Sequence, residues 1–166
     1  MKVNIALLTV TDTRTIDNDK SGGILVDKIK ESNHNLIDRK ICKDNKNDIV
    51  LILKDWLKNE KIDTIITTGG TGLTGRDITP EALDEIADKH IPGFGEVFRN
   101  ISLKTVGTSA IQSRACAVLS NGKYVFALPG SSGGVTDAWE GILKHQLDVN
   151  HKPCNFVELF PRLKEK

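Results

Sequence analysis

A run of glycines and threonines in the middle of the chain has the residue types of an anion-binding loop. Residues 68–77 read TGGTGLTGRD and follow apolar residues typical of a buried strand. Glycines leave main-chain amides open to an anion, and threonine hydroxyls can donate hydrogen bonds to it. Arg76 and Asp77 adjoin the turn, which favours a phosphate site. A tight turn that only needs positive φ angles is the alternative.

Two common nucleotide-binding patterns do not fit this loop. Gly70, Gly72 and Gly75 match GxGxxG, but a dinucleotide fingerprint needs a helix that begins on the glycines and an acid about 20 residues further on. Pro80 delays the helix. The P-loop pattern fails because Arg76 and Asp77 stand where Lys and Ser or Thr are required. The sequence therefore indicates neither an NAD site nor a kinase-type P-loop.

A second glycine-rich segment, residues 130–134 (GSSGG), matches the GxSxG pattern of a serine hydrolase that would use Ser132. The downstream acids and histidines in hydrolase order are Asp137, Asp148, His145 and His151. Asp137 and His145, however, are predicted to share the helix that begins here, whereas a hydrolase draws its acid and histidine from separate later loops. A helix cap is the plainer interpretation of the two serines. The hydrolase remains a remote alternative.

Strands and helices alternate along the rest of the chain. Apolar runs predict strands at residues 3–10, 36–42, 63–68, 115–120 and 124–128. Helical spacing of apolar residues predicts helices over residues 24–30, 49–57, 93–104 and 135–143, with another that begins at Pro80. Asn121 and Gly122 predict a two-residue hairpin between the last two strands. Such alternation is typical of a doubly wound α/β domain.

Two local predictions concern the segments next to the first and third strands. Residues 11–22 are polar and prone to turns, so we expect a loop that extends to Gly22. Thr79 is expected to cap the following helix, with Pro80 at its first helical position.

The position of the polar loops carries the functional prediction. In a doubly wound sheet, ligands bind outside the carboxyl ends of the strands. We therefore expect four segments to meet at one edge: residues 11–14, the surroundings of Asp44, residues 68–79 and residues 129–134.

Composition narrows the class of protein. The 166 residues, 39% of them hydrophobic, predict one domain that spans residues 1–166. A net charge of +1 from 23 basic and 22 acidic residues gives no general attraction to nucleic acid or to an anionic membrane. The 3 cysteines lack CxxC spacing and are expected to be reduced. The N-terminus runs directly into a strand pattern without a signal peptide, so we expect a cytoplasmic protein.

Longer motifs bring a family resemblance. They are TGGTGLTGRDITPE at residues 68–81, PGFGEVFR at 92–99, SR at 113–114 and LPGS at 128–131. Together they resemble the molybdenum cofactor biosynthesis family that includes MoaB, MogA and the G domain of gephyrin, over essentially the whole chain. The opening TVTDTR (9–14) and the closing KPCNF (152–156) are most similar to the B branch of that family.

The resemblance implies a three-layer α/β/α sandwich with a mostly parallel, MogA-like sheet, assembled as a homotrimer or homohexamer. It implies binding of molybdopterin, a pterin that carries a dithiolene and a terminal phosphate. Active relatives adenylylate that phosphate with Mg-ATP and release pyrophosphate. A non-catalytic molybdopterin carrier or scaffold is the alternative within the same family. Other proteins of molybdenum cofactor biosynthesis are the implied partners.

The resemblance also assigns residues. Asp44 and Asp77 match the catalytic aspartates of the family and are the implied Mg²⁺ ligands. Mg²⁺ in proteins is usually bound by one or two carboxylates together with phosphate oxygens. The implied substrate-binding residues are Asp12, Thr68, Gly69, Gly70, Thr71, Gly72, Glu96, Ser113, Arg114, Pro129 and Gly130.

Structural roles remain open beside these assignments. Asp44 and Asp77 are also candidates to cap a helix and a turn, and Arg114 to form an ion pair. For Glu96 we favour a packing role. Ser132 stands where many adenylylating members have the second proline of PGxP, a change expected to weaken nucleotide binding.

Overall fold

The computed structural model describes residues 1–165 and contains a mixed six-stranded sheet of order β2-β1-β3-β6-β5-β4. The strands are β1 (Asn4–Val10), β2 (Asn35–Cys42), β3 (Thr64–Thr68), β4 (Lys89–His90), β5 (Cys116–Ser120) and β6 (Lys123–Leu128). β1, β2, β3 and β6 are parallel, while β5 pairs antiparallel with both β6 and β4. The sheet is therefore mostly parallel, as predicted.

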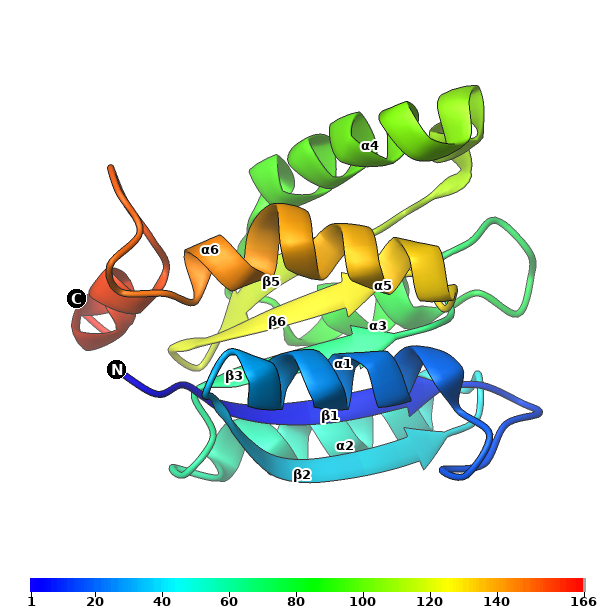
Figure 1. Ribbon diagram of the computed structural model, residues 1–166. Coiled ribbons are helices and arrows are strands. Elements are labelled where there is room, and N and C mark those ends of the chain that lie inside the picture. Colours follow the sequence, from blue (N-terminus) through cyan, green and yellow to red (C-terminus); the bar gives the residue numbers. More distant parts are fainter. Residues whose placement is uncertain (166) are drawn as a thin grey trace.

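Helices cover both faces of the sheet (Figure 1). On one face lie α1 (Lys20–Glu31), α4 (Pro92–Val106), α5 (Ser132–Ala138), η2 (Trp139–Leu143) and α6 (Lys144–Gln146). On the other lie α2 (Lys46–Lys58) and α3 (Thr79–Ile86). Alternate residues of β1 explain this arrangement, because Ile5 and Leu7 pack into one apolar cluster and Ala6 and Leu8 into the other. The three-layer α/β/α prediction is confirmed.

The hairpin between β5 and β6 is confirmed as well. Asn121 and Gly122 have positive φ angles of 47° and 72°, which a two-residue hairpin of this kind requires. The hairpin makes β5 antiparallel to β6. Cys116, the first residue of β5, therefore pairs with Ala127 near the carboxyl end of β6. The segment before β5 therefore reaches the same sheet edge as the loops that follow the parallel strands.

Several short elements were not predicted from the sequence. They are the edge strand β4 and the 3₁₀ helices η1 (Gly107–Gln112) and η3 (Val157–Arg162). Elements this short have no hydrophobic period that a sequence window can detect. Near the C-terminus, the rings of Phe156 and Phe160 pack at a tilt against Tyr124 on β6. No helix in residues 1–165 is long and apolar enough to span a membrane.

Two local predictions are wrong. α1 begins at Lys20, because the Asp19 side chain accepts the amide of Gly22 and caps the helix, so residues 20–22 are helical. Thr79 is not the cap of α3. Ile78 occupies the cap position without a side-chain hydrogen bond, and the Thr79 hydroxyl donates to the Gly69 carbonyl at 2.8 Å. That contact ties the helix to the glycine loop.

Candidate functional site

The loops expected at one edge of the sheet do meet there. The strand register pairs Thr9 with Thr68, Val10 with Cys42, and Thr68 with Leu128. β1, β2, β3 and β6 therefore end level with one another, and the loops that follow them are neighbours. The arrowheads of β1, β2 and β6 point to this common edge in Figure 1.

The glycine loop after β3 has a backbone that other residues cannot easily adopt. Gly69 and Gly70 have φ angles of 101° and 68°. A Cβ on Gly69 would lie 2.1 Å from the carbonyl oxygen of Val10. The Thr68 hydroxyl donates to the carbonyl of Pro129 at 2.7 Å and joins the two glycine-rich segments. The loop thus needs its first two glycines for geometry as well as for any ligand.

Arg114 supports the glycine loop from behind. Its Nε donates to the Gly72 carbonyl at 2.7 Å and its Nη2 to the Asp77 carbonyl at 2.9 Å, while Nη1 forms an ion pair with Glu81. The main-chain amide of Arg114 also donates to Thr71. Arg114 lines neither of the two hollows that lie at this edge of the sheet, so the role of its contacts is to hold the loop in shape.

Two hollows lie at this edge and share a wall. The larger has a volume of about 560 Å³ and the smaller about 270 Å³. The larger hollow is lined by Thr71, Gly72, Phe98, Ser102, Ser113, Pro129 and Asp137, among others. The smaller is lined by Thr13, Arg14, Ser21, Asp44, Thr68, Gly69 and Arg76, among others. Gly70, Asp77 and Gly130 line both. Two different molecules could therefore bind with their ends in contact at this shared wall.

Asp44 lies against the glycine loop. Its Oδ1 is 3.1 Å from the position of a Cβ on Gly70. Burial raises the pKa of Asp44, and the neighbouring carboxylates of Asp12 and Asp77 raise it further, while Arg76 opposes them. Negative charge is thus concentrated in this part of the smaller hollow.

Asp12 and Asp77 are held ionised by their own partners. Arg76 donates to Asp12 at 2.6 Å through Nη2, and this hydrogen bond lowers the pKa of Asp12. Burial acts to raise the pKa of Asp77, but hydrogen bonds from the hydroxyl and amide of Thr74, at 2.8 and 2.9 Å, leave it below its usual value. Asp77 therefore both closes the turn and places a carboxylate on the shared wall.

The acids fit a hard divalent cation that also binds phosphate. Within residues 1–165, no group of three or more His, Cys, Asp or Glu side chains is arranged to hold a metal by protein ligands alone. Mg²⁺ usually takes only one or two carboxylates and completes its shell with phosphate oxygens and water. Asp44, whose pKa is raised by burial and by nearby carboxylates, would gain most from a neighbouring cation.

Replacing Asp44 by Asn is expected to raise the melting temperature of the unliganded protein at pH 7. A pKa raised above 3.8 in the folded state means that ionised Asp44 destabilises the fold at any pH above that raised value. The gain should fade as the pH falls through the raised pKa and vanish below 3.8, where Asp44 is protonated in both states. Melting curves of both proteins at pH 7 and pH 3.5 check this. A lower melting temperature for Asp44→Asn at pH 7 would contradict the electrostatics.

The structure brings most of the predicted site residues together. Asp44, Thr68, Gly69, Gly70, Thr71, Gly72, Asp77, Ser113, Pro129 and Gly130 line one or both hollows. Asp12 lies at the rim, where its carboxylate accepts the amide of Asp44 at 3.2 Å. Glu96 is apart from them, exposed on α4 beside a separate hollow that Arg99 and Cys116 also line. The helix after β2 is capped by Asn45 rather than by Asp44.

Sequence reasoning missed the far wall of the larger hollow. Phe98, Ser102 and Thr105 on α4 and Ser109 on η1 line it. Asp137 on α5 lines it too and accepts the Thr105 hydroxyl at 2.9 Å. The spacing of Phe98, Ser102 and Thr105, which are four and three residues apart on one face of α4, is the sequence signal that was available.

The geometry gives no support to a serine hydrolase. Ser131 caps α5 by accepting the amide of Gly134 at 3.1 Å. Asp137 and His145 lie on one continuous helical run, as predicted. His145 instead lies beside His151, with ring centroids 5.2 Å apart and the rings tilted by 42°. In the described part of the chain, neither Ser131 nor Ser132 receives a histidine hydrogen bond.

The cysteines offer no nucleophile at this edge. Burial raises the pKa of Cys42 to about 12 and that of Cys116 to about 11. Both thiols therefore stay protonated and unreactive near neutral pH. Cys154 is exposed and, like the other two, not in a disulfide.

Comparison with known proteins identifies the family of this chain. The family model described as "Probable molybdopterin binding domain" matches residues 6–149, which include the glycine loop, both acids and the shared wall. The chain belongs to this family. The molybdopterin-binding family resemblance seen in the motifs is thereby confirmed.

Relatives within the family are similar over nearly their whole length. Molybdenum cofactor biosynthesis protein B of Escherichia coli strain K12 is 42% identical over 161 residues, covering 97% of this chain and 93% of the relative. A crystal structure of a molybdenum cofactor biosynthesis protein B has a TM-score of 0.89 at 36% identity and covers 100% of this chain and 98% of its own. A MogA structure has a TM-score of 0.78 at 27% identity, covering 87% of this chain and 97% of its own. The fold is therefore MogA-like.

Proposed function

We propose that this protein acts in molybdenum cofactor biosynthesis by binding molybdopterin with its terminal phosphate at the glycine loop. The observation that carries the proposal is the wall shared by the two hollows, where loop backbone and the Asp77 carboxylate meet. The family match and the names of the relatives support molybdopterin as the ligand.

The larger hollow suits the pterin. Its volume of about 560 Å³ lies within the range of about 300–1,000 Å³ typical of small-molecule sites. Asp137 offers a carboxylate to the N–H groups of a pterin ring, and the exposed Val106 offers an apolar surface. Open amides of the loop next to the wall would bind the phosphate.

We propose adenylylation of that phosphate as the reaction. The pterin phosphate oxygen bonds to the α-phosphorus of ATP, and the bond from that phosphorus to the bridging oxygen breaks. The bridging oxygen leaves with the electron pair as pyrophosphate. Asp44 and Asp77 would hold Mg²⁺, which supplies charge neutralisation for the phosphate oxygens. The chain itself contributes position and preorganised donors, so it needs no nucleophilic side chain.

Pyrophosphate release tests the proposal. Purified protein incubated with molybdopterin, ATP and Mg²⁺ should release pyrophosphate above a blank that lacks molybdopterin. Binding of molybdopterin without release of pyrophosphate would favour the second candidate function, a carrier or scaffold. The sequence PGSS at residues 129–132, in place of PGxP, supports this second candidate. The protein should not cleave a chromogenic ester, since cleavage would indicate the serine hydrolase alternative that uses Ser132.

A homotrimer or homohexamer is the proposed assembly. Exposed apolar side chains on α4 and η1, Val97, Leu103 and Ile111 among them, support an interface between copies. Light scattering should give three or six times the mass of one chain. Leu103→Asp is expected to reduce that mass, because it places a charge on this surface, whereas Lys61→Asp in the exposed turn between α2 and β3 should not. A monomeric wild-type protein would contradict the assembly.

The cytoplasm is the proposed location. The free state of all three cysteines supports it, because a reducing compartment keeps thiols from pairing.

A further inference from the structure

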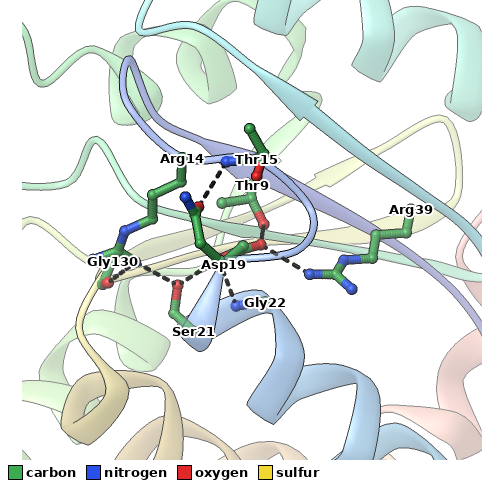
Figure 2. A network of polar contacts seen from close by, with 9 residues as sticks. Thr9, Arg14, Thr15, Asp19, Ser21, Gly22, Arg39 and Gly130 are labelled. Carbon is green, nitrogen blue, oxygen red and sulfur yellow. Dashed lines mark hydrogen bonds and ion pairs between the residues drawn. The ribbon is translucent and has the colours of Figure 1, made fainter.

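The smaller hollow contains a cationic side chain that the proposed reaction has not yet used. Arg14, in the loop after β1, is exposed and lines this hollow together with Ser21. It does not line the larger hollow. The Arg14 side chain extends to the Gly130 carbonyl, so its guanidinium lies beside the shared wall (Figure 2).

The guanidinium of Arg14 has spare hydrogen-bonding capacity. Arg39 and Arg76 form ion pairs with Asp19 and Asp12, but Arg14 forms none within residues 1–165. Its protein contacts are two long ones from Nη1, 3.4 Å to the Gly130 carbonyl and 3.5 Å to the Ser21 hydroxyl. A guanidinium carries five N–H donors, so most of them are available to an anion.

A buried network keeps the surroundings of Arg14 in place. Asp19 is fully buried and accepts the Thr9 hydroxyl at 2.6 Å and the Arg39 Nη2 at 3.1 Å (Figure 2). The Ser21 hydroxyl donates to the other Asp19 oxygen at 3.3 Å. Because Arg39 compensates Asp19, that carboxylate does not compete for Arg14. Ser21, fixed by this network, positions the guanidinium at the hollow.

The charges of the hollow select the kind of anion. A bare phosphate would bind Arg14 but meet the carboxylates of Asp44 and Asp77 in the same hollow. A polyphosphate with a divalent cation satisfies both kinds of group. The volume of about 270 Å³ is below the range of about 300–1,000 Å³ for drug-sized ligands, which suits the polyphosphate end of a nucleotide better than a whole nucleotide.

We propose that Arg14, positioned by Ser21, forms a subsite for the β- and γ-phosphates of ATP and for the departing pyrophosphate. The inference rests on the proposed function. In-line displacement puts the leaving group opposite the attacking oxygen. The pterin phosphate approaches the shared wall from the larger hollow, so pyrophosphate leaves into the smaller one, beside Arg14. The guanidinium stabilises the charge that accumulates on the bridging oxygen as the bond breaks.

Binding of Mg-pyrophosphate to Arg14→Gln tests the subsite without any need for turnover. The variant loses two long contacts and should fold normally. In calorimetry, Mg-pyrophosphate should bind wild-type protein and bind Arg14→Gln at least ~10-fold more weakly, a loss typical of one charge-assisted contact. Lys20→Gln, the matched control, removes an exposed charge at the start of α1 outside the hollow and should bind like wild type. Equal binding by Arg14→Gln and wild type, or no binding by wild type, would overturn the subsite.

Turnover separates this inference from the proposed function. Wild-type protein that binds Mg-pyrophosphate through Arg14 but releases none from ATP and molybdopterin would support the subsite and refute adenylylation. Wild-type protein that releases pyrophosphate while Arg14→Gln does so at the same rate would overturn the subsite and leave adenylylation standing. If both hold, Arg14→Gln should lower the rate at saturating molybdopterin while molybdopterin affinity stays unchanged.

Discussion

Asp77→Asn is expected to reduce pyrophosphate release from ATP and molybdopterin by ~100-fold or more, the range for lost positioning and electrostatic stabilisation. Asp77 lies on the wall where the two hollows meet and is held ionised by Thr74. Asn has the same size, and its carbonyl oxygen can still accept the Thr74 amide and hydroxyl. The variant therefore removes the charge and keeps the turn.

Three measurements isolate the role of the Asp77 charge. Pyrophosphate release gives the rate, thermal melting reports the fold, and molybdopterin titration reports the larger hollow, where affinity should stay close to that of wild type. Asp55→Asn is the matched control because Asp55 is 73% exposed on α2, far from either hollow. Undiminished release by Asp77→Asn would remove this carboxylate from the mechanism.

Gly69→Ala is expected to damage both the fold and the site. The alanine would need a φ of 101°, and its Cβ would meet the Val10 carbonyl oxygen at 2.1 Å. Because that contact is with the backbone of β1, no side chain can move aside. We expect the free energy of unfolding to fall by ~2 kcal/mol or more. Molybdopterin affinity should fall as well, since the loop amides shift.

Gly75→Ala is the control for this prediction because it lies in the same loop. A Cβ there meets nothing within 4 Å and the backbone needs no positive φ, so the change in stability should stay within about 0.5 kcal/mol. Urea unfolding of both variants gives the comparison. If Gly69→Ala and Gly75→Ala unfold alike, the strained conformation of the glycine loop is wrong.

The sequence predicts the sheet well because burial on both faces leaves a plain signal. β1, β3 and β6 are rich in apolar and β-branched residues and are buried along almost their whole length, and their carboxyl ends follow from the alternation with helices. Once these ends share an edge, the glycine loop and Asp44 must meet. The family motifs add the identity of the ligand, which the residues alone do not reveal.

The errors arise where tertiary contacts override local preferences. The start of α1 depends on Asp19, whose cap is stabilised by Thr9 and Arg39 from two strands. Thr79 would suit a helix cap, but the Gly69 carbonyl is a partner that only the folded loop supplies. The lining of the larger hollow by α4 and η1 depends on where that helix packs, and helical periodicity does not report this.

The wall of Gly70, Asp77 and Gly130 has a consequence for inhibitor design. Since the two hollows adjoin at these three residues, one compound with a short connection can occupy both. A pterin phosphate bearing a non-hydrolysable bisphosphonate would lose translational freedom once while gaining the contacts of both halves. Such a compound should be selective because it contacts Arg14 at one end and Asp137 at the other. Enzymes that bind only pterins or only nucleotides should bind it weakly.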